Sequence, residues 1–215
     1  MEDLFDVFIG LDPGVVGGIS ILEQYAKYSI IINRVPVKNI VVNNKKKKTY
    51  DLDEFYNILS KFSGKKVLFI QEKVASRPGE GSVSSFNFGK SCGSTLGMAI
   101  AFGFKVIEVS PSTWKKDFSQ LNNANINGMK EETKILRALA KTLKDKDLKN
   151  ENKKQIEKLN RQIKIEAKSQ ARSLASSLYP EFSDFFKQKN SDGMAESLLI
   201  AIYGRNNQNE LVQKC

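Results

Sequence analysis

Apolar and polar positions in the first third of the chain alternate in short runs separated by turn residues. Three runs rich in Ile and Val, at 6–11, 17–23 and 28–37, are punctuated by "DPG" and "GG". Such runs bounded by Gly and Pro predict strands of an antiparallel meander. The lysine run "NNKKKK" at 43–48 is interpreted as a solvated loop, which is also able to touch phosphates.

The pattern then switches between helical spacing and buried strands. Residues 50–62 carry apolar side chains at helical spacing, and 65–74 reads as a buried strand. A Gly- and Ser-rich loop at 75–85 leads into a helix at 86–104, whose small residues suit close packing on a sheet. A strand at 105–111 and a loop or short helix at 112–118 complete the order β-β-β-α-β-α-β, which predicts an α/β layer fold.

Residues 119–170 differ in kind from this α/β pattern. Leucines and isoleucines at three-then-four spacing lie on both sides of "DKDLKNE", which predicts an antiparallel two-helix hairpin, or one long helix if the middle does not break. Between Lys141 and Gln170 there are 10 basic and 5 acidic residues, half of the excess of +10 in the whole chain. The segment is therefore a candidate DNA-contacting arm, a dimer interface, or a solvated helical pair.

Length and composition fit one soluble domain. A chain of 215 residues, 40% of them hydrophobic, can bury a core, so we expect a single domain over 1–215 with a helical insertion at about 119–165. No run approaches the roughly 20 apolar residues of a membrane span, and the N-terminus lacks signal-peptide features. We expect an intracellular, cytoplasmic protein of bacterial or viral origin, with an organellar origin as the alternative, and with no membrane partner.

The charge balance favours a polyphosphate partner. Lys and Arg exceed Asp and Glu by 10, and the pI is about 9.5. A lysine-rich composition without such a partner is the alternative. The two cysteines, Cys92 and Cys215, make no disulfide framework, and the absence of histidine argues against a zinc site, so metal chemistry is left to carboxylates.

Four carboxylates stand where charge is costly. Asp12 ends an apolar strand, Glu72 ends "VLFIQ", and Asp192 and Glu196 lie four apart at the border of an apolar helical stripe. Each alone fits a turn or capping residue. Together they are the oxygen ligands that Mg²⁺ or Mn²⁺ prefers, and two such ions cleave phosphodiesters in other enzymes.

Ordered motifs narrow this hypothesis to a family. "FIGLDPGVVGGISILE" and "FIQEKV" resemble the opening strand and the strand-end glutamate motif of the RuvC family of Holliday-junction resolvases, in its shorter phage and bacterial branch. "SSFNFGKSCG", "VSPSTWKKDF", "AKSQARSLASSLYP" and "SDGMAESLLIAIYGR" resemble its later elements in order. The resemblance covers most of residues 5–118 and 166–205.

The resemblance implies both a fold and an activity. The fold would be RNase H-like, with a mixed five-stranded sheet flanked by helices. The activity would be metal-dependent endonuclease cleavage of four-way DNA junctions by a homodimer that nicks two strands symmetrically, with no small-molecule cofactor. On this carry-over Asp12, Glu72, Asp192 and Glu196 are ligands of about two Mg²⁺ or Mn²⁺ ions, and Lys115 is a supportive catalytic lysine that stabilises phosphoryl charge.

Three departures from the family pattern change the expected details. The last two acids are spaced by four with Glu second, instead of two aspartates spaced by three. The last helix carries no basic or histidine counterpart, so proton steps fall to water at the metal or to a lysine. The aromatic that unstacks a junction base is replaced by Ala75, with Phe86 or Phe88 as substitutes.

Other functions compete with this prediction. Actin-like ATPases also open with a Gly-x-Asp-x-Gly turn, but they need a second phosphate-binding hairpin in a later, duplicated domain. This chain has no internal repeat that could supply one. A nuclease for other branched DNA or RNA–DNA hybrids, and a junction-binding protein without strong catalysis, remain alternatives. For the nuclease, the glycines after Asp12 are interpreted as leaving room for metal and phosphate near the backbone.

Overall fold

The computed structural model describes residues 4–24, 29–42, 44–75, 79, 81–121, 124–188 and 190–213. Predictions that involve Tyr28, Asn43, Cys215, and residues 76–78 and 80 of the 75–85 loop therefore lie outside the described residues. Among the residues that are described, no helix combines the length and the apolar character needed to cross a membrane.

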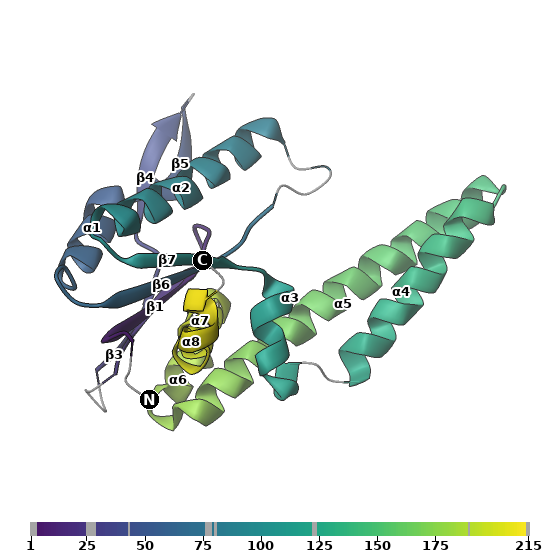
Figure 1. Cartoon of the computed structure of the whole chain (residues 1–215). Coiled ribbons are helices and arrows are strands. Elements are labelled where there is room, and N and C mark those ends of the chain that lie inside the picture. Colours follow the sequence, from purple (N-terminus) through teal and green to yellow (C-terminus); the bar gives the residue numbers. More distant parts are fainter. Residues whose placement is uncertain are drawn as a thin grey trace.

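The central sheet has five strands in the order β3-β2-β1-β6-β7 (Figure 1). Their bounds are β1 Val7–Asp12, β2 Gly18–Glu23, β3 Ile30–Arg34, β6 Val67–Glu72 and β7 Lys105–Val109. β2 runs antiparallel to β1 and β3, whereas β6 is parallel to β1 and β7. This mixed five-stranded sheet, flanked by helices, confirms the RNase H-like fold class.

The alternation of side chains along β1 explains why helices cover both faces of the sheet. Val7, Ile9 and Leu11 join a core shared with α1 (Leu52–Ser60) and α2 (Ser82–Ala101). Phe8 instead joins a second core with α5 (Lys146–Leu178) and α7 (Asp192–Asn206). Successive strand residues point to opposite faces, so Asp12, four residues after Phe8, lies on the α7 face.

Glycines let α7 approach the sheet at backbone distance. A Cβ on Gly10 would lie 2.2 Å from the carbonyl oxygen of Ser197, and one on Gly18 would lie 2.4 Å from that of Gly193. Gly17 and Gly193 also form a parallel bridge. The interpretation that the glycines after Asp12 leave room for metal and phosphate is thus wrong for Gly17 and Gly18, because backbone already fills that space.

Lys45–Lys48 lie in a strand, so the loop prediction is wrong for the lysines of the 43–48 run, whereas Asn44 is a turn residue. β4 (Val37–Val42) pairs antiparallel with β5 (Lys45–Tyr50) in a separate two-stranded sheet, which we call the β4–β5 ribbon. Pro36 separates β4 from β3, so the strand predicted at 28–37 is divided there. Pairing with β4 satisfies the backbone of the lysine residues, and their exposed side chains need no core.

Residues 119–170 confirm the two-helix hairpin over the single long helix. α4 (Ala124–Thr142) packs against α5, and the pair extends away from the body (Figure 1). The helical conformation is interrupted between Thr142 and Lys146. The carboxylate of Asp145 accepts hydrogen bonds from the backbone N–H groups of Asp147 and Leu148 at 2.8 and 2.9 Å, which caps the start of α5. The predicted end of the insertion at 165 falls inside α5, which continues without a break to Leu178.

Short elements connect the larger ones. The helices are α3 Pro111–Trp114, α6 Ser183–Phe186 and α8 Gln208–Gln213, and the 3-10 turns are η1 Lys115–Asp117, η2 Ser119–Leu121 and η3 Pro180–Phe182. α3 follows β7, and Val109 at the end of β7 pairs with Glu72. The chain therefore leaves β7 for α3, η1 and the α4–α5 hairpin at the edge of the sheet where Glu72 lies.

Candidate active site

Strand register brings Asp12 and Glu72 to one edge of the sheet. β1 and β6 are parallel and Leu11 pairs with Gln71, so the next residues, Asp12 and Glu72, are neighbours. Leu68 and Ile70 point to the α7 core, and Glu72 shares their face by alternation, as Asp12 shares that of Phe8. Both carboxylates are therefore on the face of the sheet that α7 covers.

α7 and η1 add Glu196 and Lys115 to these two acids. The ammonium of Lys115 donates a hydrogen bond to Glu196 Oε1 at 2.7 Å, across two elements that are 81 residues apart in sequence. Both side chains are half-buried or more, so solvent screens this pair less than it would a surface pair. Four of the five predicted site residues, Asp12, Glu72, Lys115 and Glu196, thus gather at one place.

The environment of Asp12 favours its protonated form. Burial is the largest cause that raises the pKa of Asp12 well above its ordinary value, followed by the negative charges of Glu196 and then Glu72. Lys115 and Lys168 act in the opposite direction and do not compensate. Ionised Asp12 therefore lacks sufficient positive charge nearby, which is the situation that a divalent cation would relieve.

Lys115 stays a cation at neutral pH. Burial alone would lower the pKa of its ammonium, but the charge of Glu196, the hydrogen bond to it, and the charges of Glu72 and Asp12 together raise it. An ammonium with a raised pKa is a poor general base. The suggestion that a lysine takes over proton steps is therefore disfavoured for Lys115, and its charge-stabilising role stays a prediction.

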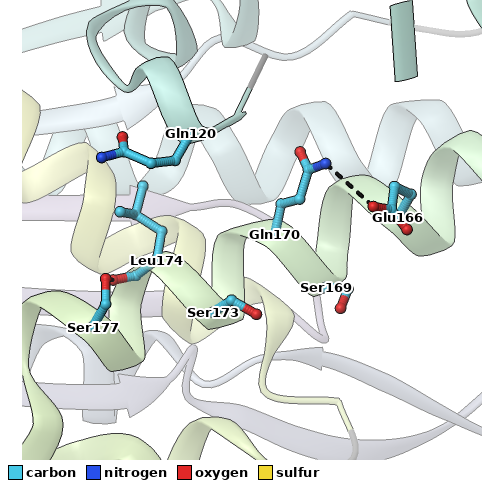
Figure 2. A pocket seen from close by; sticks show the side chains of 7 residues that line it. All are labelled: Gln120, Glu166, Ser169, Gln170, Ser173, Leu174 and Ser177. Atoms are coloured by element: carbon cyan, nitrogen blue, oxygen red, sulfur yellow. Dashed lines mark hydrogen bonds between the residues drawn. The ribbon is translucent and has the colours of Figure 1, made fainter. Parts of the chain in front are cut away.

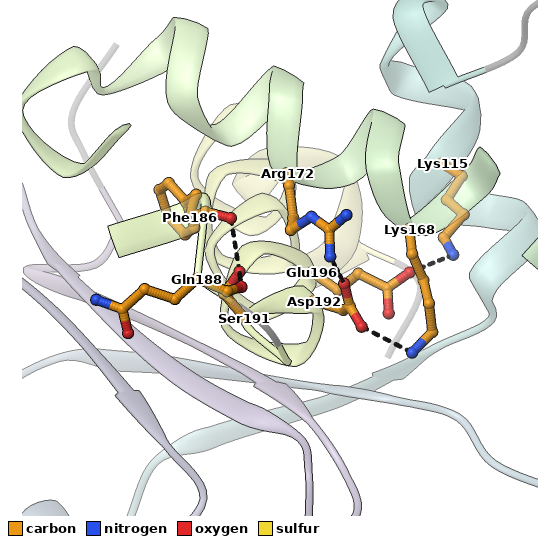
Figure 3. A network of polar contacts seen from close by, with 8 residues as sticks. All are labelled: Lys115, Lys168, Arg172, Phe186, Gln188, Ser191, Asp192 and Glu196. Carbon is orange, nitrogen blue, oxygen red and sulfur yellow. Dashed lines mark hydrogen bonds and ion pairs between the residues drawn. The ribbon is translucent and has the colours of Figure 1, made fainter. Parts of the chain in front are cut away.

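Asp192, the fifth predicted residue, is held by two cations of α5. Lys168 donates to Oδ2 at 2.8 Å and Arg172 to Oδ1 at 2.6 Å, so both carboxylate oxygens are engaged (Figure 3). Ser191 precedes Asp192 and its Oγ lies 2.7 Å from the carbonyl oxygen of Phe186, which fixes the start of α7. Asp192 and Glu196 thus face cations from different elements.

Sequence reasoning missed three residues that hold these acids. Lys168 and Arg172 are four apart in "AKSQARS", and this spacing places two cations on one helical face, so the signal was present. Trp114 is buried, and its indole N–H donates to Glu72 Oε2 at 2.9 Å. Its position next to Lys115 in sequence was the one available hint.

The turn after Asp12 is tied to the β4–β5 ribbon. The backbone N–H of Gly14 donates to the hydroxyl of Tyr50 at 2.6 Å, and Tyr50 is buried. Of the two aromatic residues considered for base unstacking, Phe86 is 71% exposed, whereas Phe88 lies beside Gly14, 3.9 Å from the position of an added Cβ. Phe86 is therefore the more exposed of the two, and Phe88, which is partly buried, is the one beside the turn after Asp12.

The donor chemistry fits a hard divalent cation. Asp12, Glu72 and Glu196 offer carboxylate oxygens, and their mutual repulsion at Asp12 is relieved by positive charge. Within the described part of the chain, no three Cys, Asp or Glu side chains stand as a ready metal-binding group. Asp192 and Glu196 are paired with lysine and arginine instead, so ligation by all four acids stays a prediction.

A separate open cavity of about 400 Å³, lined mostly by residues with polar side chains, lies along α5 (Figure 2). Gln170 donates to Glu166 at 3.4 Å on its wall. None of the five predicted site residues lines this cavity, so it is distinct from the carboxylate site. The lining residues are Gln120, Glu166, Ser169, Gln170, Ser173, Leu174 and Ser177.

Comparisons with known proteins find similarity in fold only. No protein-family model and no curated protein matches the chain. Among solved structures, RuvC of Thermus thermophilus in complex with a Holliday junction substrate matches with 11% identity and a TM-score of 0.47, covering 95% of each chain. A second Thermus thermophilus RuvC structure matches with 14% identity and a TM-score of 0.43, covering 95% of this chain and 96% of that one.

Proposed function

We propose that this chain is a metal-dependent endonuclease that cleaves four-way DNA junctions. The observation that carries the proposal is the gathering of Asp12, Glu72 and Glu196 around the ammonium of Lys115 at one sheet edge. Carboxylates in this number with one cation suit a site that takes up further positive charge and then a phosphate. The net charge of +10 fits a polyanionic substrate.

Each side chain has a distinct part in the proposed mechanism. Asp12, Glu72 and Glu196, joined by Asp192, would hold Mg²⁺ or Mn²⁺, which supplies Lewis-acid stabilisation of a phosphoryl group when bound. The indole of Trp114 orients Glu72 through its hydrogen bond. Lys115, kept protonated, stabilises negative charge that develops on the phosphoryl oxygens.

The α5 cations have a positioning part. Lys168 and Arg172 fix Asp192 at the start of α7, so the orientation of this carboxylate depends on the α4–α5 hairpin to which they belong. We propose that residues 1–215 act as one nuclease domain, because α5 runs unbroken from the hairpin into the core at Leu174 and Ala175.

Cleavage of a mobile four-way junction tests the function directly. With Mg²⁺ or Mn²⁺ we expect paired nicks at symmetric positions, and weaker cleavage of linear duplex, flap and RNA–DNA hybrid substrates. Faster cleavage of a flap or a hybrid would reassign the substrate to other branched DNA or to hybrids. Binding of the junction with no cleavage of any substrate would indicate a binding protein instead.

The second part of the proposal is a homodimer, because symmetric nicking needs two active sites related by a twofold axis. The outer face of α2 offers an interface. Val83, Phe86 and Ile100 on this face are 65%, 71% and 62% exposed. Between them, Cβ atoms added to Gly89, Gly93 and Gly97 would meet nothing within 4 Å, whereas Thr95 and Ala99 are buried. The prediction that the small residues of this helix pack on the sheet is therefore confirmed for Thr95 and Ala99 and wrong for the three glycines.

A glutamate in place of Gly93 is expected to convert the dimer to a monomer. The site faces open space, and glycine disfavours a helix by roughly 1 kcal/mol relative to alanine, so the folded monomer should not suffer. Gly128→Glu in α4 is the matched control, because an added Cβ there also meets nothing within 4 Å. Sedimentation velocity at several concentrations measures the state, and dissociation by Gly128→Glu alone would place the interface on the α4–α5 hairpin.

A further inference from the structure

The β4–β5 ribbon leaves the body at the same sheet edge as the carboxylates. Arg34, the last residue of β3, pairs with Gly18, and Gly18 pairs with Asp12. β3 therefore ends level with Asp12, with β2 between them, and the ribbon begins three residues later. Tyr50, the last residue of the ribbon, pairs with Val37, the first, so both lie at its base. The hydroxyl of Tyr50 accepts the hydrogen bond from Gly14, two residues after Asp12. Both ends of the ribbon are thus anchored near the candidate active site.

The ribbon is basic on both of its faces. Side chains alternate along β5, so Lys45 and Lys47 project to one face and Lys46 and Lys48 to the other. All four are exposed, and the described residues of the ribbon include no Asp or Glu. Contact with a single flat layer of phosphates would require lysines on one face of the ribbon only. The ribbon instead carries them on both faces.

A groove of duplex DNA matches this charge distribution. The major groove is about 12 Å wide, admits a two-stranded β-ribbon, and has a phosphate backbone on each side. Lysines serve to blunt exposed sheet edges in many proteins, but Val41 beside them is 70% exposed, which a purely solubilising surface would avoid. An exposed apolar side chain is compatible with contact to base edges in a groove.

We propose that the β4–β5 ribbon enters a groove of one duplex arm of the substrate and contacts phosphates on both sides through Lys45, Lys46, Lys47 and Lys48. The proposal rests on the proposed function, since it assigns the DNA contact of that nuclease. Because the base of the ribbon is bonded to the turn after Asp12, binding there would fix the duplex relative to the carboxylate site.

Two double variants, one for each face, test the proposal. Lys45→Gln with Lys47→Gln, and Lys46→Gln with Lys48→Gln, are compared with wild type for binding to a four-way junction in EDTA over a series of salt concentrations. Groove entry predicts that both doubles weaken binding, and that each lowers the log-log salt slope by about 1.8, at about 0.9 per lost phosphate contact. Circular dichroism checks that each variant is folded.

A control separates this from a general loss of charge. Lys61→Gln with Lys66→Gln removes the same charge from exposed positions. Lys66 directly precedes β6, and Glu72 is at the other end of that strand, so this control lies near the end of the sheet opposite to the carboxylates. We expect its binding and salt slope to match wild type. An effect of only one ribbon face, or an effect equal to that of the control, would overturn groove entry.

Failure of the ribbon and failure of the nuclease give different results. A wild type that cleaves junctions while both ribbon doubles bind normally would overturn the ribbon proposal and leave the proposed function standing. A wild type that binds and is weakened equally by both doubles, but never cleaves, would overturn the nuclease and support the ribbon. Absence of any junction binding by the wild type would overturn both.

Discussion

Replacing Asp12 with asparagine is expected to lower Mg²⁺- or Mn²⁺-dependent nicking of a four-way junction by orders of magnitude while junction binding persists. The amide keeps the shape of the side chain and removes the charge that a divalent cation needs. Glu72→Gln should have the same effect, because Glu72 is the strand neighbour of Asp12. Single-turnover nicking rates and gel-shift affinities measure the two quantities separately.

The thermal stability of Asp12→Asn is expected to distinguish loss of activity from loss of folding. The pKa of Asp12 is raised in the folded state, so the fold binds this proton more tightly than the unfolded chain. In EDTA the free energy of unfolding should therefore fall as pH rises from about 4, the ordinary aspartate value, through the raised pKa. At neutral pH Asp12→Asn should melt several degrees higher than wild type, since 1 kcal/mol is about 2–4 °C at this length.

Added Mg²⁺ should reverse this order. It should raise the melting temperature of wild type more than that of Asp12→Asn, because only the wild type keeps the full carboxylate set. Asp184→Asn is the control, since Asp184 is 94% exposed and pairs only locally with Lys187 among the residues described. Normal nicking by Asp12→Asn, together with an unchanged melting temperature, would show that the catalytic centre lies elsewhere.

The strands β1, β2 and β6 were predictable because their signals are local. The runs that form them are continuous apolar stretches bounded by turn residues, and the resemblance carried by the ordered motifs implied that they join one mixed five-stranded sheet. Burial of these strands is nearly complete in the structure, so pattern and environment agree. The carboxylates at their ends could be predicted for the same reason.

The β4–β5 ribbon was not predictable from pattern. Lys45–Tyr50 has no apolar alternation until its last residues, so nothing in its composition indicates a strand. Its strand conformation comes from backbone pairing with β4, and its anchor is the hydrogen bond between Tyr50 and Gly14. Such contacts depend on the fold and leave no local trace in a charged run.

The roles of glycines were misassigned because a glycine carries no side-chain signal. Gly18 was read as space for a ligand, and in the structure it allows contact with Gly193 of α7. Gly93 belongs to the helix whose small residues were expected to pack on the sheet, and its Cβ position is open. What a glycine faces is settled by the partner backbone, which is distant in sequence.

The ion pairs of the last helix reveal how tertiary contacts complete a site that the sequence indicated only in part. Asp192 and Glu196 were correctly placed on a helix that packs on the sheet. Their partners, Lys168 and Arg172 for Asp192 and Lys115 for Glu196, come from elements at least 20 residues away. Only the packing of α5 and η1 against α7 brings these charges together.

Replacing Lys115 with alanine is expected to lower the nicking rate at saturating metal by about 10²–10³, the usual effect of removing one group that stabilises transition-state charge. The ammonium is kept protonated by Glu196, Glu72 and Asp12, so at neutral pH it is present as a full charge beside the carboxylates. Junction affinity should change little, because one contact among many phosphates contributes a small share of binding. Lys115→Arg should restore part of the rate.

Lys116→Ala is the matched control for this prediction. Lys116 follows Lys115 in the same 3-10 turn but is exposed, and among the described residues no ion pair joins it to an acid. Loss of the same charge from the neighbouring position should leave the rate near wild type. A purely structural role of Lys115 would show instead as a lower melting temperature without a change in the rate of the folded protein. Equal rates for the two alanine variants would mean that the ion pair with Glu196 has no part in catalysis.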